Sequence, residues 1–162
     1  MAEARDVVRE VRLRPVEDQD LGVFFEHQAD PEANEMAAFP ARGQDQFAAH
    51  WARVRADDAS VLRTIVADGT VAGYITSWEQ DGQRLIAYWI GREHWGRGVA
   101  TQALGQFTRQ LTARPLHAHV AAHNAGSVRV LEKCAFRRDR VREATAPAPE
   151  DGIEELIFVL DA

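Results

Sequence analysis

The chain has 162 residues, of which 46% are hydrophobic and 27% are charged, so we expect one domain over 1–162 that buries its own core. Its net charge of −6 argues against nucleic acid as the main partner and is compatible with a cationic acceptor such as an amine. No apolar run is long enough to span a membrane, no secretory signal opens the chain, and the single cysteine excludes a disulfide framework, so the default location is cytoplasmic.

Hydrophobic periodicity and turn residues divide the chain into alternating strands and helices. In chain order, the pattern predicts a strand at 7–14, helices at about 18–28 and 44–57 joined by an irregular segment at 30–40, strands at 60–67, 71–78 and 85–90, a helix at 98–112, a strand at 116–121, a helix beginning at 124, a strand at 136–142, a linker at 144–152 and a strand at 153–160. Asp68-Gly69 and Asp81-Gly82 each favour a tight hairpin turn between two strands.

A glycine-rich turn at 91–98 joins the apolar strand at 85–90 to the helix that follows it. Gly96 and Gly98 lack a Cβ atom, so the backbone can turn sharply there and approach a ligand closely. The start of a helix leaves unpaired N–H groups and a partial positive charge, which favour a phosphate or pyrophosphate, and Arg97 adds a charged donor. We therefore predict an anion-binding turn, with a strand-to-helix turn that binds no ligand as the alternative.

Two common nucleotide-binding motifs do not fit this turn. A P-loop requires a lysine directly after its glycines, but the only lysine of the chain is Lys133. A Rossmann fingerprint requires glycine or alanine where Thr101 stands and an acidic residue about 20 positions later, where this chain has 114–119 instead. A dinucleotide is therefore not expected.

The turn resembles the acetyl-CoA site of the GNAT superfamily of N-acetyltransferases. The signature of that family is Gln/Arg-x-x-Gly-x-Gly/Ala, and its last three positions match Gly98-Val99-Ala100, whereas Trp95 departs from the Gln/Arg position. The form Trp-Gly-Arg-Gly-Val-Ala-Thr at 95–101 is similar to the branch that contains the ribosomal-protein N-terminal acetyltransferases.

A second segment, 124–136, resembles the family's Asn-x-x-Ser/Ala-x-x-x-Leu/Tyr-Glu-Lys-x-Gly-Phe sequence. Asn124 can cap a helix while its side chain faces the pantetheine arm of the cofactor. Ala135 stands where the family usually has glycine at the end of that helix. With the two motifs in the family's order, the resemblance covers essentially the whole chain.

The resemblance implies an α/β (α+β) fold of the GNAT acyl-CoA N-acyltransferase type, with a mixed, twisted sheet of six to seven strands and about four helices. The fourth and fifth strands would diverge and admit acetyl-CoA between them. The cofactor positions that carry over are Tyr88, Trp89 and Ile90 for the thioester and pantetheine, Gly96, Arg97, Gly98, Val99, Ala100 and Thr101 for the pyrophosphate, and Asn124 and Ser127. No metal is implied.

The implied activity is direct transfer of an acetyl group from acetyl-CoA to a primary amine of a small molecule or of a protein or peptide N-terminus. A non-catalytic module that binds acyl-CoA and regulates a partner is the alternative. Because dimers are common in the family, a homodimer stays open.

Three residues are candidates for proton transfer. Leu131 stands where many members of the family have a proton-donating tyrosine, so the resemblance assigns that task to Ser127, with a purely structural hydrogen bond as the alternative. His119 is the candidate base, because imidazole side chains change charge near neutral pH, and Glu79 is the alternative base.

Two further groups of residues have both a functional and a structural interpretation. His117, His119 and His123 could be metal ligands if a further residue completed the set, but packed or exposed histidines are the common case. The segment at 30–40 mixes carboxylates with apolar side chains, which suits a cationic amine on an apolar stem, and it is the expected acceptor pocket. Its candidate residues are Glu32, Asn34, Glu35, Met36 and Phe39.

Overall fold

A computed structural model describes residues 6–147 and 152–162 of the chain. Within these residues, seven strands form one mixed sheet in the order β1-β2-β3-β4-β5-β7-β6. The strands are β1 (Val11–Arg14), β2 (Val61–Ala67), β3 (Thr70–Gln80), β4 (Gln83–Ile90), β5 (Leu116–Ala121), β6 (Arg137–Arg138) and β7 (Glu155–Leu160). The helices are α1 (Asp20–Gln28), α2 (Pro31–Ala37), α3 (Gln44–Ala56), α4 (Val99–Gln110), α5 (Ala125–Lys133) and α6 (Arg140–Thr145), with a 3₁₀ turn, η1 (Arg92–His94).

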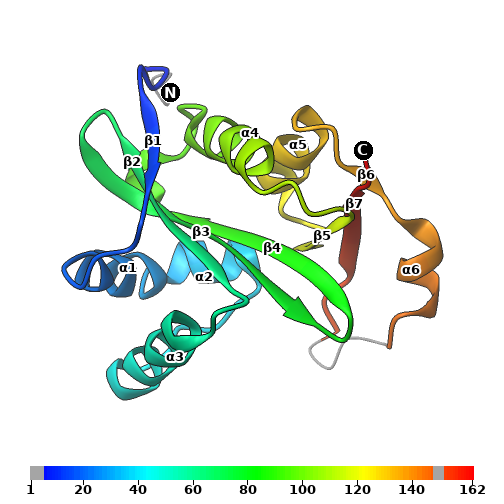
Figure 1. The fold of residues 1–162 in the computed structure, drawn as a ribbon, viewed down its shortest axis with the longest axis horizontal. Helices are drawn as coiled ribbons and strands as arrows, with labels where there is room; N and C mark the ends of the chain where they lie inside the picture. The colour runs from blue at the N-terminus through cyan, green and yellow to red at the C-terminus, as the bar shows by residue number, and fades with distance from the viewer. Residues whose placement is uncertain (1–5, 148–151) are drawn as a thin grey trace.

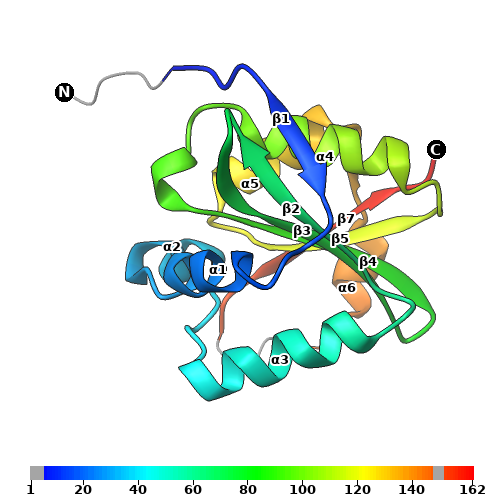
Figure 2. The ribbon, with the colours of Figure 1, turned by 60° about the vertical axis from the view of Figure 1, so that its left-hand side comes forward.

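The helices form layers on both faces of the sheet. In Figure 1 and Figure 2, α4 and α5 lie on one face, and α1, α2 and α3 lie on the other. The larger core lies beneath α4 and α5, where Leu104 and Phe107 pack against residues of the sheet such as Ile75. A smaller aromatic core holds α1 and α3 to the other face, and its members are Phe24, Phe47 and Trp51, with Tyr74 of β3 packed against them. None of the helices in 6–147 and 152–162 combines the length and apolar character that crossing a membrane requires.

Two tight hairpins connect β2, β3 and β4, and both confirm the turns predicted from sequence. Asp68 and Gly69 have φ angles of 48° and 83°, and Asp81 and Gly82 have φ angles of 52° and 77°. Positive φ at both central residues is typical of the type I′ turn, whose twist matches that of the strands it joins. The three strands therefore form a meander whose register is set by local sequence.

The sheet opens between β4 and β5, as the resemblance implied. These two strands are parallel and pair only at Arg84–Leu116 and Leu85–His117. Beyond these pairs, β4 continues to Ile90, and β5 instead pairs along its length with β7. The divergence leaves a space between the two strands in the middle of the molecule.

Several segments differ from the prediction. The strand predicted at 7–14 begins only at Val11, and the first two positions of the linker predicted at 144–152 belong to α6. The segment at 30–40 is not irregular throughout, because Asp30 caps α2 by accepting a hydrogen bond from the Glu32 N–H, and Pro31 stands in its first turn. The strand predicted at 136–142 pairs with its neighbour β7 at two residues only, and Asp139 then caps α6. Six α-helices are thus present in the described residues instead of about four. Of the predicted linker at 144–152, positions 148–151 lie outside the described residues.

A buried carboxylate fastens α1 to the first two strands. Asp20 is 1% exposed and accepts hydrogen bonds from Arg14 at 2.7 and 2.9 Å, from the Thr64 hydroxyl at 2.7 Å and from the Glu17 N–H at 2.8 Å. Burial alone would raise the pKa of Asp20, but these hydrogen bonds outweigh it and lower the pKa from 3.8 to about 2.

Asp20→Asn is expected to lower the free energy of unfolding by about 3 kcal/mol, because it leaves the Arg14 guanidinium without its anionic partner. Since the folded-state pKa lies below the unfolded one, the contribution of Asp20 is fully present above about pH 4 and disappears as the pH falls toward about 2. Urea denaturation at several pH values measures both effects. Asp18→Asn is the control, because Asp18 is 95% exposed in its pair with Arg55 and should change stability by less than about 1 kcal/mol. Equal losses in the two variants would contradict the stabilising role of the buried pair.

Candidate active site

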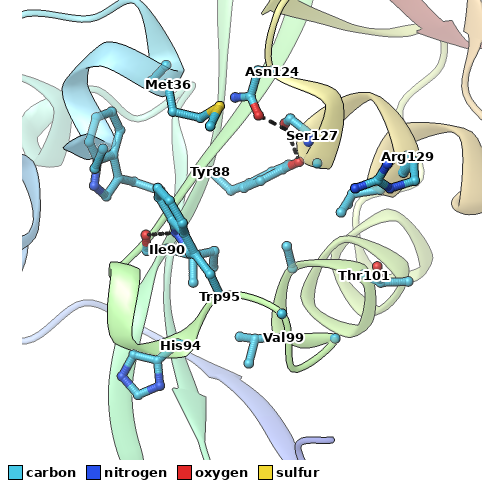
Figure 3. A pocket seen from close by; sticks show the side chains of 18 of the residues that line it. Met36, Tyr88, Ile90, His94, Trp95, Val99, Thr101, Asn124, Ser127 and Arg129 are labelled. Carbon is cyan, nitrogen blue, oxygen red and sulfur yellow. Dashed lines mark hydrogen bonds between the residues drawn. The ribbon is translucent and has the colours of Figure 1, made fainter. Parts of the chain in front are cut away.

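Two cavities meet where β4 and β5 diverge. The smaller has a volume of about 450 Å³ and lies among β4, the start of α4, α5 and α2. The larger has a volume of about 780 Å³ and lies among β4, β5, α6 and the start of β7. Four residues line both cavities: Ala37, Tyr88, Asn124 and Ser127. Figure 3 shows Tyr88, Asn124 and Ser127 gathered on one side of the smaller cavity.

The start of α4 forms one wall of the smaller cavity. The sequence predicted an anion-binding turn at this place. Gly96 and Gly98 have φ angles of 76° and 82°, in the left-handed region that favours glycine. Gly98 is the N-cap of this 12-residue helix, and no side chain caps it. A Cβ atom at Gly98 would meet no atom within 4 Å, so the backbone there is open to the cavity. The residues of the predicted turn that line the cavity are Gly96, Gly98, Val99, Ala100 and Thr101.

The Arg97 side chain is the exception within this turn. Its guanidinium donates to the Asp68 carboxylate at 2.8 Å and to the Asp6 carbonyl at 3.0 Å, and it is not among the residues that line either cavity. The predicted contact of this side chain with the ligand stays a prediction, and in this structure the guanidinium is engaged elsewhere. Arg97 instead ties the turn to the β2–β3 hairpin, a contact that no local pattern indicated.

Two basic side chains that sequence reasoning missed also line the smaller cavity. Arg129 and Lys133 lie on α5, four positions apart and therefore on one side of the helix. That spacing, read together with the predicted cap at Asn124, was the signal that could have found them. No carboxylate lines this cavity among the described residues. The smaller cavity is therefore positively charged and has an open helix N-terminus, which together suit a polyanionic ligand.

A pair of hydroxyl groups lies at the junction of the two cavities. The Tyr88 and Ser127 oxygen atoms are 2.5 Å apart, and either can be the donor. Asn124 accepts a hydrogen bond from the Ser127 N–H at 3.3 Å, which confirms its predicted capping role (Figure 3). Burial raises the pKa of Tyr88 to about 12. The sequence prediction gave the Tyr88 backbone a role but gave its side chain none. Because side chains alternate along a strand, the Tyr88 side chain shares one face of β4 with the buried Ile86 and Ile90, and this was the signal for it.

The larger cavity has the opposite charge. It is lined by Glu143, Glu154 and Glu155, and by no lysine or arginine within the part of the chain that the structure describes. The Glu143 carboxylate is paired with Arg138, so the negative charge comes from Glu154 and Glu155. His119 projects from β5 into the same lining, and its Nδ1 lies 2.8 Å from a carboxylate oxygen of Glu155 on β7. The sequence predicted His119, but not its carboxylate partner.

The other proposed proton-transfer and metal residues do not join this group. Glu79 pairs with Arg84 at 3.2 Å and lines neither cavity. His117 is buried, and burial lowers its pKa, while His123 donates from Nε2 to the Glu35 carbonyl at 2.9 Å. No group of three or more metal-ligating side chains is found among residues 6–147 and 152–162.

The segment at 30–40 lines the two cavities with apolar residues and not with its charged side chains. Met36 lines the smaller cavity and Phe39 the larger one, so the segment predicted as the acceptor pocket borders both cavities. The Glu32 carboxylate accepts a hydrogen bond from Arg92 at 2.7 Å, and neither Asn34 nor Glu35 is among the lining residues. Since Arg92 follows β4 and His123 follows β5, α2 is bonded to the chain beyond both diverging strands.

The comparisons with known proteins agree with this geometry. The family model described as acetyltransferase (GNAT) domain matches residues 10–137. No curated protein sequence matches the chain. Among solved structures, an acetyltransferase of the GNAT family from Bacillus anthracis has a TM-score of 0.76 at 14% identity and covers 95% of this chain and 96% of its own. Spermidine N-acetyltransferase from Vibrio cholerae, in complex with CoA and spermine, has a TM-score of 0.73 at 17% identity, with 92% of each chain covered. Aminoglycoside acetyltransferase AAC(6')-Ib, in complex with coenzyme A and kanamycin, has a TM-score of 0.74 at 19% identity, with 94% of this chain and 95% of its own covered.

Proposed function

The chain belongs to the GNAT acetyltransferase family, and from this membership we propose that it transfers the acetyl group of acetyl-CoA directly to a primary amine that carries further positive charge. The observation that carries the proposal is the opposite charge of two cavities that share Tyr88 and Ser127. A basic cavity suits the phosphates of coenzyme A, and an acidic one attracts a cationic acceptor. The two substrates would then meet at the shared residues.

The residues of the smaller cavity fit coenzyme A. The backbone N–H groups of Val99, Ala100 and Thr101 at the start of α4 would hold the pyrophosphate, where the helix N-terminus adds partial positive charge. Arg129 and Lys133 would pair with the remaining phosphate charge. When bound, the cofactor supplies an acetyl group that is already activated as a thioester.

The backbone of β4 would bind the rest of the cofactor. Tyr88, Trp89 and Ile90 all line the smaller cavity, beyond the last pair that β4 makes with β5. Asn124 would reach the pantetheine arm from the other side of the cavity. Arg97 would contribute its backbone N–H only, since its side chain is bonded to Asp68.

The residues of the larger cavity fit an ammonium group that must lose a proton before it can attack. His119 would accept that proton, because its Nδ1 is held by Glu155 and its Nε2 is left for the acceptor. We favour His119 over Glu79 as the base, because Glu79 lines neither cavity. Ser127 remains the proposed donor toward the cofactor.

A panel of amines tests the function, with release of the CoA thiol as the signal. The panel contains spermidine and kanamycin, which are related to the molecules named for the structural neighbours, together with neutral amines. It also contains peptides with free N-termini, because 95–101 resembles the ribosomal-protein acetyltransferase branch. We expect turnover with amines that carry two or more positive charges and much slower turnover with neutral ones. Tight binding of CoA without turnover on any acceptor would instead support a non-catalytic acyl-CoA-binding regulator.

His119→Ala is expected to lower kcat/KM by about 10²-fold near neutral pH, because the group that accepts the ammonium proton is lost. Glu155→Gln should give a smaller loss, since glutamine can still hold the imidazole by a hydrogen bond but lacks the charge. His50→Ala is the control, because His50 lies on α3 and lines neither cavity. A kcat/KM for His119→Ala equal to the parent value would move the base role to water.

A further inference from the structure

The Tyr88 and Ser127 hydroxyls are the only side-chain O–H groups that line both cavities within the described residues. Tyr88 comes from β4 and Ser127 from the first turn of α5, so the two come from opposite sides of the opening in the sheet. Their oxygen atoms are 2.5 Å apart, a distance within the range of O–H···O hydrogen bonds. Figure 3 shows the phenol ring pointing directly at the start of α5.

The surroundings hold this pair in place. Ser127 is positioned by the hydrogen bond from its N–H to Asn124, and Tyr88 packs against the larger core between Ile86 and Ile90. Leu131, at the position where the resemblance implied a tyrosine in many relatives, is only 2% exposed and belongs to that core. The phenol that α5 lacks is therefore supplied from β4.

The acidity of the phenol limits what it can do alone. Burial raises the pKa of Tyr88 to about 12, whereas an ordinary thiol has a pKa near 8.5, so a one-way donation from Tyr88 to a thiolate would run against the difference in pKa. Two hydrogen-bonded hydroxyls avoid that cost if the first gains a proton and passes its own to the second, while the second gives its own proton away. Neither oxygen then becomes an anion.

We infer that Tyr88 and Ser127 act together as a proton shuttle between the acceptor nitrogen and the sulphur of coenzyme A, an inference that rests on the acetyl transfer proposed above. The acceptor ammonium first loses one proton to His119. The nitrogen–carbon bond then forms, and the carbon–sulphur bond breaks with its electron pair moving onto sulphur. The nitrogen gives its second proton to one hydroxyl, the proton of that hydroxyl passes to the other, and the proton of the second passes to sulphur. Both side chains end neutral, an amide forms, and CoA leaves as the thiol.

Tyr88→Phe and Ser127→Ala test the shuttle with the best acceptor from the panel. We expect each variant to lower kcat by 10- to 100-fold while the KM for acetyl-CoA stays within about threefold of the parent, because only the proton path is broken. The double variant should be no slower than the slower single variant, since the two hydroxyls act as one unit. Tyr74→Phe is the matched control, because Tyr74 is the chain's other tyrosine, lies in the aromatic core under α1 and α3, and lines neither cavity.

A solvent isotope measurement separates the shuttle from a structural role. The rate of the parent is measured in mixtures of H₂O and D₂O, under conditions where chemistry limits turnover. A plot of this rate against the deuterium fraction should bow below a straight line, because more than one proton moves in the same step. Both single variants should show a linear dependence. A positioning role alone would lower the rate without changing the form of this dependence.

The possible outcomes are distinguishable. A parent that turns over no acceptor contradicts the proposed function itself. An active parent whose Tyr88→Phe variant keeps its kcat, or whose two losses multiply in the double variant, overturns the shuttle and leaves Ser127 acting alone. If either variant unfolds or loses CoA binding, fluorinated tyrosine is incorporated in the Tyr74→Phe background, where Tyr88 is the only tyrosine. A kcat that changes with the acidity of that phenol supports the shuttle, and an unchanged kcat overturns it.

Discussion

Gly73→Ala is expected to destabilise the protein by about 3 kcal/mol or more, the largest stability effect that the structure predicts for a single methyl group. Gly73 lies on β3 opposite Ile90 of β4. A Cβ atom there would lie 1.9 Å from the carbonyl oxygen of Trp89 and 3.1 Å from the Ile90 Cα atom. Because both contacts are with backbone, no side-chain rotation can relieve them, and β4 itself would have to move.

Urea denaturation measures the loss, and Gly22→Ala provides the matched control. Gly22 lies within α1, and a Cβ atom there would meet nothing within 4 Å. This variant should stabilise the fold by about 0.5–1 kcal/mol, because alanine is the better helix former. If Gly73→Ala retained the parent stability to within 1 kcal/mol, the close approach of β3 to β4 described here would be contradicted. Gly73→Ala should also weaken CoA binding, because the displaced strand β4 carries Tyr88 and Trp89.

Gly98→Val is expected to weaken CoA binding by about 10- to 100-fold, which corresponds to about 1.4–2.7 kcal/mol. The cause is conformational rather than a clash with the protein, because a Cβ atom at Gly98 meets nothing within 4 Å. A φ angle of 82° is unfavourable for any residue with a Cβ atom, and most of all for a β-branched one. Valine would relax away from this conformation and turn the N–H groups of Val99 and Ala100 away from the pyrophosphate.

Gly69→Val is the control that separates the effect of backbone strain on stability from the effect on CoA binding. Gly69 has a φ angle of 83° and, like Gly98, no atom within 4 Å of a built Cβ, but it lies in the β2–β3 hairpin and does not line either cavity. Both variants should lose a similar amount of stability, whereas only Gly98→Val should lose affinity for CoA in isothermal titration calorimetry. Unchanged affinity in Gly98→Val would argue against the start of α4 as the phosphate site.

Features encoded by neighbouring residues were predictable. The hairpins at Asp68-Gly69 and Asp81-Gly82, the glycine turn before α4 and the Asn124 cap each depend on the φ preference or side-chain reach of a few adjacent residues. The signals for α2 were also present, since Asp30 followed by Pro31 is a favourable helix start, but seven residues gave too little periodicity to indicate a helix. The strand predicted at 136–142 is only two residues long, because Asp139 caps α6 directly after it.

Contacts between distant residues were not predictable in this way. Tyr88 meets Ser127 across 39 positions, His119 meets Glu155 across 36, and the Arg97 guanidinium turns away from the cavity toward Asp68, 29 positions earlier. The separation of basic and acidic side chains into two cavities has the same origin, because it depends on where α5, α6 and β7 pack beside the opening in the sheet.

The sequence by itself therefore determined the strand–turn–helix that we propose as the anion site and, through two spaced motifs, the family of the fold. The tertiary structure alone decided which side chains face that site and which hydroxyl, imidazole and carboxylate groups meet beside it. The physical reason is that dihedral preference and hydrophobic period act over a few residues, whereas the early end of the pairing between β4 and β5 and the pairing of β5 with β7 bring together atoms that the chain separates by dozens of positions.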